Sequence, residues 1–139
     1  MNIKNILALL LMIAGGQLFA QNIAGTYTMR LDGNQIYTDR TPVLENVNGT
    51  TTFTITQTGD EITVTMSGFQ SEWSAHIMKG RVGNNRFVAA LSNGDRSIYM
   101  IQGTVNGGQL EGEYVYVRHG NASSGIVPGW THVNYQAKK

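Results

Sequence analysis

Two glutamates in this sequence have a spacing that could in principle support catalysis. Glu111 and Glu113 stand two positions apart in a segment of alternating polar and apolar residues. On a β-strand their carboxylates therefore project from the same face, roughly 7 Å apart, which falls in the range used by inverting glycosidases. The alternation places them opposite the apolar face, however. We expect exposed charges facing basic groups on neighbouring strands, without a cleft around them.

The three histidines, His76, His119 and His132, do not form a metal-ligand motif. No two are two or four positions apart, and no acidic residue stands at a ligand-like spacing from them. The chain has no cysteine, which excludes disulfides, thiolate metal sites and a cysteine nucleophile. We expect no metal, no cofactor and no catalytic motif. An enzyme would need His76 within hydrogen-bond reach of a second titratable group.

The elements that position these residues are predicted to be strands. After Gln21 the apolar residues recur with period two, and no segment keeps the spacing of an amphipathic helix. Phe53 and Ile55, for example, alternate with threonines. Clusters rich in Gly and Asn separate the segments and favour tight hairpins. The predicted strands lie at about 22–31, 50–57, 62–66, 73–82, 85–91, 96–105, 109–118 and 130–137.

A repeat with an offset of 23 residues supports consecutive hairpins. The pattern Met78-x-Gly80-x-Val82 then Phe87-x-Ala89-x-Leu91 returns as Ile101-x-Gly103-x-Val105 then Leu110-x-Gly112-x-Tyr114. One hairpin cannot bury its apolar face alone, so the copies must close on one another. The small residues on the inward face indicate either sharply coiled strands, which we favour, or a void for a ligand.

These observations predict an all-β chain, an eight-stranded antiparallel up-and-down β-barrel that leaves no open edge, with a two-sheet β-sandwich as the alternative. Gly25-x-Tyr27, at the start of the first strand, resembles the Gly-x-Trp opening of lipocalins and avidin-type barrels, with Tyr in place of Trp. The length and the meander are also similar to avidins and fatty-acid-binding proteins. The resemblance implies a calycin-like barrel over residues 22–137, and it transfers no binding residue to this chain.

Residues 1–20 have the pattern of a secretory signal peptide. Lys4 precedes an apolar run, Ile6 to Ala14, and Leu18-Phe19-Ala20 ends the segment. The run is about half the roughly 20 residues that a membrane span needs, and without cysteine a lipid anchor is excluded. We expect residues 21–139 to be one domain exported to the periplasm or the medium, because the segment resembles signal-peptide ends of Gram-negative bacteria. Without Lys4, nine basic and nine acidic residues remain, which gives no electrostatic reason to bind nucleic acid or an anionic membrane.

Two sets of side chains are candidates for function. Apolar walls with a few hydroxyl or imidazole groups suit a small-ligand pocket, and eight strands enclose either one small ligand or a filled core. The candidate interior residues are Tyr27, His76, Tyr99, Tyr114, Tyr116 and Trp130. A second, apolar set alternates out of phase and predicts a homo-oligomer or partner interface, unless loops 32–49 and 119–129 cover it. Its members are Trp73, Ile77, Ile98, Met100, Val115 and Val117.

From the sequence we therefore expect a non-enzymatic barrel that binds a small, largely apolar or amphipathic ligand in its interior. The alternative is a structural or inhibitory module that uses the outer apolar face to contact another protein. The third hypothesis is an enzyme at the end of the barrel, built on His76. The residues do not identify the ligand, the oligomeric state or the end of the barrel that is open.

Overall fold

The computed structural model describes residues 21–39, 41–66, 76–92, 97–120, 122–125 and 128–139. The predicted signal peptide and Trp73 lie outside these residues. The elements in chain order are β1 (Gly25–Asp39), β2 (Thr41–Thr58), β3 (Glu61–Met66), β4 (His76–Gly83), β5 (Arg86–Ser92), β6 (Ser97–Asn106), β7 (Gln109–Arg118), the short 3-10 helix η1 (Ala122–Ser124) and β8 (Gly129–Lys138). Within the described residues, no helix is long and apolar enough to cross a membrane.

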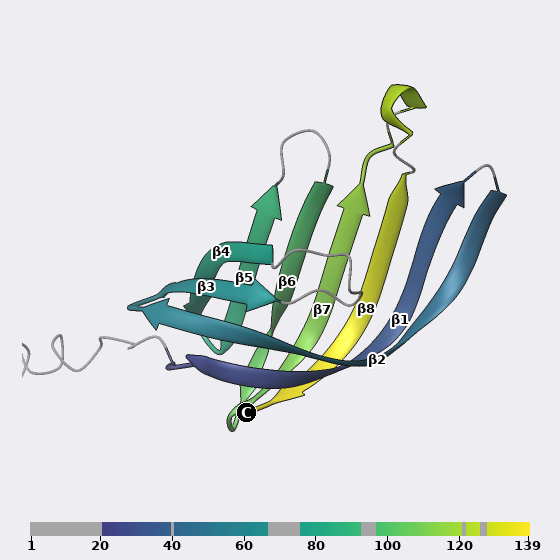
Figure 1. The fold of residues 1–139 in the computed structure, drawn as a ribbon. Helices are drawn as coiled ribbons and strands as arrows, with labels where there is room; N and C mark the ends of the chain where they lie inside the picture. The colour runs from purple at the N-terminus through teal and green to yellow at the C-terminus, as the bar shows by residue number, and fades with distance from the viewer. Residues whose placement is uncertain (1–20, 40, 67–75, 93–96, 121, 126–127) are drawn as a thin grey trace, which may run out of the picture.

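Each strand pairs with the next in an antiparallel ladder, and β8 pairs with β1 to close a barrel (Figure 1). This confirms the predicted eight-stranded up-and-down barrel. Long β1 makes the closure possible, because it pairs with β2 along its whole length and with β8 from Thr28 to Tyr37. One end, called the lower end here, carries the β6–β7 turn and the C-terminus (Figure 1). The upper end carries η1 and the tip of the β1–β2 hairpin (Figure 1).

The predicted loop at 32–49 is wrong. Residues 32–39 continue β1, residues 41–49 begin β2, and the two segments pair from Asp32↔Asn48 to Asp39↔Thr41. Asparagine and glycine in this region indicate a loop by composition, but the neighbouring strand supplies the hydrogen bonds that outweigh local preference. The hairpin extends the wall of the barrel toward the upper end, where it adds outward-facing residues that the sequence analysis left out.

Alternation along the strands divides the inner from the outer wall as predicted. Phe53, Phe87 and Leu110 are almost fully buried, and the residues between inward positions are exposed or half-buried. The predicted hairpin turns also hold. Asn84 and Asn85 between β4 and β5, like Gly107 between β6 and β7, have positive φ angles, which short hairpins require.

The small residues of the 23-residue repeat serve close approach of the strands. A Cβ added to Gly80 would lie 1.8 Å from the carbonyl oxygen of Val88, and one added to Gly112 would lie 2.0 Å from that of Gln102. Gly103 leaves room for Tyr135, whose hydroxyl donates a hydrogen bond to the Gln102 carbonyl at 3.1 Å. An added Cβ at Gly80, Gly103 or Gly112 would meet atoms of the neighbouring strands, so the space beside these glycines is occupied and is not a void for a ligand.

The lower end is closed by the residues just before β1. Ile23 is buried, its amide donates a hydrogen bond to Gln57 Oε1 at 2.8 Å, and its carbonyl accepts one from the Tyr27 hydroxyl at 2.8 Å. The Tyr27 ring stacks on Phe53 with 5.3 Å between ring centroids. Burial raises the pKa of the Tyr27 hydroxyl. Tyr27, the aromatic residue of the Gly-x-Tyr motif, therefore packs the lower end of the barrel.

Candidate functional site

A column of three aromatic rings stands on the inner wall toward the upper end. His76 comes from the start of β4, Tyr99 from β6 and Tyr116 from β7. The rings of His76 and Tyr99 stack with 4.0 Å between centroids, and those of Tyr99 and Tyr116 with 4.7 Å. Tyr99 and Tyr116 are opposite each other in the β6–β7 register, which brings their side chains together on the inner face. We call these three residues the aromatic column.

Polar groups surround the aromatic column. The Tyr99 hydroxyl is hydrogen-bonded to the side chains of Ser97 and Tyr116, and the positive charge of Arg118 lies close enough to act on it. Thr131 on β8 lies opposite Tyr116 on β7, and it is 4% exposed. Its hydroxyl oxygen is buried and has no hydrogen-bond partner among the described residues. An unpaired hydroxyl on a buried wall costs about 1–3 kcal/mol, so the position needs an explanation.

Burial shifts the pKa values of two members of the aromatic column, His76 and Tyr99. It lowers the pKa of His76, which favours the neutral imidazole. It also raises the pKa of Tyr99, although the hydrogen bond from Ser97 and the charge of Arg118 oppose that effect. The column is therefore an uncharged aromatic surface at neutral pH. His76 meets Tyr99 face to face, a contact suited to packing and not to proton transfer between these two rings.

The other predicted interior residues lie elsewhere. Tyr27 is at the lower end, and Tyr114 is buried on β7 two positions before Tyr116. The expectation that Trp130 faces inward is wrong, because it is 38% exposed and stands beside His132 with 5.8 Å between ring centroids. The cause is the alternation of inward and outward residues along β8. Thr131 and Val133 are buried, so Trp130 and His132, which alternate with them, face outward.

An apolar belt crosses the outer wall near the upper end. Opposite positions in successive ladders run from β2 through β1, β8 and β7 to β6. The belt consists of Leu44, Ile36, Trp130, Val117 and Ile98. Leu44 is 65% exposed and Ile98 47%. Met100 and Val115 form part of the row below, as predicted for outward residues, whereas Ile77 is exposed on β4, apart from the belt.

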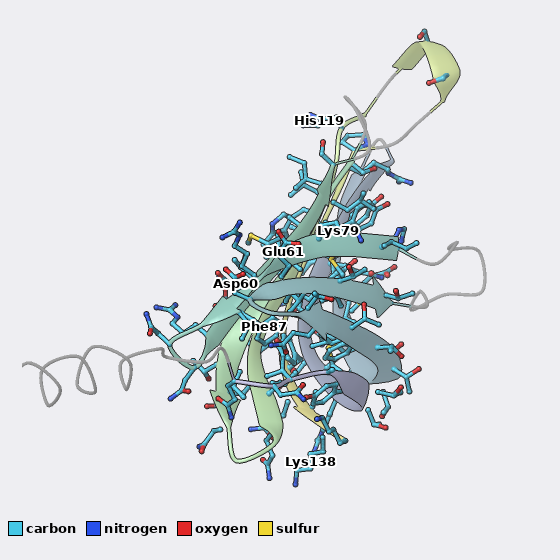
Figure 2. All side chains as sticks on the ribbon, turned by 90° about the vertical axis from the view of Figure 1, so that its left-hand side faces the viewer. Asp60, Glu61, Lys79, Phe87, His119 and Lys138 are labelled. Atoms are coloured by element: carbon cyan, nitrogen blue, oxygen red, sulfur yellow. The ribbon has the colours of Figure 1, made fainter. Side chains whose placement is uncertain are left out.

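A groove of about 1060 Å³, lined by both polar and apolar groups, lies on the outer wall below the belt. It runs from the β4–β5 turn over β6, β7 and β8 to β1, and its lining includes Arg30, Asp32, Gln102, Glu111, Glu113 and Asn134. Figure 2 labels Phe87, which follows Arg86 at the start of β5, beside the turn where the groove begins. The outward placement of Glu111 and Glu113 is confirmed, but the prediction that no cleft surrounds them is wrong. Alternation assigns a face, whereas the hollow is formed by residues of β1 and β4 to β8 together.

One hydrogen bond and one close contact between His132 and Glu113 lie in the middle of the groove. Gln102 Nε2 donates to Glu113 Oε2 at 3.3 Å, and His132 Nε2 lies 3.8 Å from the same carboxylate oxygen. Arg81 at one edge pairs with Asp60 at 3.1 Å. Within the described part of the chain, no group of three His, Asp or Glu side chains is placed to hold a metal ion.

Comparison with known proteins adds no family to these observations. No protein-family profile and no curated protein matches the chain. Its function must therefore be argued from the inner and outer walls of the barrel themselves.

Proposed function

We propose that the protein is an exported, non-enzymatic, calycin-like barrel that binds a small amphipathic ligand at the upper end of its interior. The observation that carries the proposal is the buried Thr131 hydroxyl without a hydrogen-bond partner. A ligand atom that exchanges a hydrogen bond with this hydroxyl would remove the cost of leaving it unpaired. The likeness to lipocalins and avidin-type barrels, carried by Gly25-x-Tyr27 and the eight-strand meander, points in the same direction.

The surroundings of Thr131 indicate which ligand class fits. The Tyr99 and Tyr116 rings offer flat, uncharged surfaces for an apolar body. Arg118, half-buried next to Tyr99, supplies positive charge on the same wall. Apolar surface with a few fixed polar groups suits a ligand that has an apolar body and one hydrogen-bonding or anionic group. The lower end cannot admit it, since Ile23 and Tyr27 close that end.

Titration with amphipathic probes tests the proposal on the full chain purified after export. The probes are 1-anilinonaphthalene-8-sulfonate, followed by fluorescence, and decanoate and decanol as competitors. Replacing Thr131 by valine keeps the shape and removes the unpaired hydroxyl. We expect Thr131→Val to raise the free energy of unfolding by about 1 kcal/mol and to weaken probe binding severalfold. Decanoate should compete better than decanol because of Arg118.

The control is Trp130→Ser, which removes an exposed ring from the outer belt and should leave inner binding unchanged. Loss of the fluorescence signal in Trp130→Ser, with full binding retained in Thr131→Val, would assign the probe to the outer wall and overturn the proposal. Solvent extraction and mass spectrometry of the purified protein give an independent readout, because a ligand retained from the cell should be missing or reduced in Thr131→Val.

A second candidate function is self-association through the outer wall, and two observations favour it. The apolar belt ends on β2 at Leu44, the most exposed large apolar residue in the part of the chain that the structure describes. Over Thr41–Thr50, β2 pairs with β1, while β3 joins its other side only from Phe53 onward. A second copy pairing antiparallel along this segment would extend both sheets and join the two belts across a two-fold axis.

Sedimentation velocity tests the self-association. We expect a dimer for the natural chain and a monomer for Leu44→Lys, which places charge at the end of the belt. Lys79→Ala is the control, since Lys79 is exposed on the β4 wall away from the belt (Figure 2). A natural chain that stays monomeric, or a dimer that survives Leu44→Lys unchanged, contradicts this candidate.

A further inference from the structure

We propose that the groove on the outer wall is a second binding site, which holds a neutral oligosaccharide. The groove is independent of the interior site, because its walls are the opposite faces of the same strands. It is a defined hollow of about 1060 Å³, and its polar side chains fall into two rows fixed by the strand register.

The first row is continuous across four strands. Asp32, Asn134, Glu113 and Gln102 occupy opposite positions on β1, β8, β7 and β6. Neighbouring strands are about 4.8 Å apart, so this row of carboxylates and amides spans about 14 Å. All four side chains end in planar groups with two polar atoms, which can bind two adjacent hydroxyl groups at once.

The second row runs parallel to the first, two residues along each strand. Arg30, Gln136, Glu111, Thr104 and Arg86 lie on β1, β8, β7, β6 and β5. No ion pair within the described residues holds Arg30, Glu111 or Arg86, although all three line the hollow. Their donors and acceptors are therefore available to a ligand at little desolvation cost.

The charged residues that line the groove indicate the chemical class of its ligand. The lining contains three arginines, Arg30, Arg81 and Arg86, and three acids, Asp32, Glu111 and Glu113. The central acids on β7 repel an anionic polymer, whereas the arginines at the two sides repel a cationic one. Mixed donors and acceptors without net charge suit a neutral ligand that offers both, and hydroxyl groups do so at every sugar unit. The length of the rows favours a chain of sugars over a single one.

The test measures binding of a panel of neutral oligosaccharides to the full exported chain by isothermal titration calorimetry. The probes are cellohexaose, maltohexaose, xylohexaose and chitohexaose, with a heparin hexasaccharide and a Gly-Ser octapeptide as comparators. We expect at least one neutral sugar to bind and the comparators not to bind. The double variant Gln102→Ala/Asn134→Ala should weaken that binding at least tenfold, because it removes two of the four planar groups of the first row.

Two further variants separate hydrogen bonding from charge and from folding. Glu113→Gln keeps a planar polar group and should weaken sugar binding only a few fold. Asn46→Ala changes an exposed amide outside the groove and should leave binding unchanged, and circular dichroism verifies that each variant is folded. The proposal is overturned if no neutral sugar binds, if only heparin or the peptide binds, or if the double variant binds as well as the natural chain. Thr131→Val should not alter sugar binding, so the experiments test the groove and the interior site independently.

Discussion

The inner and outer faces of strands β6, β7 and β8 differ in burial and in the chemistry of their side chains. Their inner faces near the upper end carry Tyr99, Tyr116 and Thr131, which are buried and packed against one another. Their outer faces carry Gln102, Glu113 and Asn134, which border an open groove. Side chains on the inner wall hold the fold together and leave one hydroxyl unsatisfied. Side chains on the outer wall are exposed or half-buried and can contact a ligand.

The difference shows that one strand can serve two purposes without compromise, because successive residues face opposite sides. Removing a buried ring from the inner wall should therefore reduce stability strongly, whereas changes on the outer wall should have little effect on stability. Four substitutions or conditions test this contrast.

The largest effect is expected from removing a ring of the aromatic column. Tyr116→Ala deletes a buried ring that stacks on Tyr99 and leaves a cavity, which should cost about 3–5 kcal/mol of unfolding free energy. Urea denaturation measures the loss. The matched change on the outer face of the same strand, Glu113→Ala, should stay within about 0.5 kcal/mol. Similar losses for the two variants would contradict the division into two walls.

The next effect concerns the glycines of the repeat. Gly80→Ala would press a methyl group against the Val88 carbonyl oxygen, a backbone atom that cannot turn aside, and should cost about 1–3 kcal/mol or more. Gly49→Ala on β2 is the control, since its added methyl meets nothing within 4 Å. Thermal unfolding should separate the two variants by several degrees. A tolerated Gly80→Ala would mean that the strands do not need this close approach.

A smaller effect is expected from pH. Because burial lowers the pKa of His76, the unfolded chain binds a proton more readily than the folded one below the unfolded pKa of 6.5. The contribution of His76 to stability is therefore complete above pH 6.5 and is lost as the pH falls through the folded pKa. His76→Phe should flatten this part of the stability profile, whereas exposed His119→Asn should not. An unchanged profile in His76→Phe would assign the acid sensitivity to other groups.

The smallest effect is expected from the contact between His132 and Glu113 in the middle of the groove. His132 and Glu113 are both partly exposed and 3.8 Å apart, so His132→Gln should change the unfolding free energy by less than about 0.5 kcal/mol. The same variant leaves the Gln102 hydrogen bond to Glu113 in place. A loss as large as that of an inner-wall change would show that the outer wall also stabilises the barrel.

Several features followed from local pattern alone. Alternation around Phe53, Phe87 and Leu110 predicts which faces are buried, because a strand exposes successive side chains to opposite sides. The turn residues Asn84-Asn85 and Gly107-Gly108 predict hairpins, because they accept positive φ angles. Consecutive hairpins with no exposed edges then predict a closed barrel. The prediction for Trp130 is wrong because an error of one position in the alternation along a strand assigns a side chain to the opposite face of the sheet.

The candidate sites needed more than pattern. The phase of the strands predicted that His76, Tyr99 and Tyr116 face inward, but their stacking depends on three strands that meet at one height of the barrel. Outward Glu111 and Glu113 were visible from alternation, yet the groove around them is formed by residues of β1 and β4 to β8 together. The polar positions Gln102, Glu113 and Asn134 become one row only after the ladder register is known.

The amino-acid sequence by itself determined that this chain is all-β, which face of most strands is buried, and where its hairpins turn, since these depend on interactions between residues close in the chain. Only the tertiary structure decided the extent of the β1–β2 hairpin, the closed lower end, the unpaired Thr131 hydroxyl and the outer groove. The physical reason is that register and curvature are set by contacts between residues far apart in the chain, and a binding site is made of such contacts.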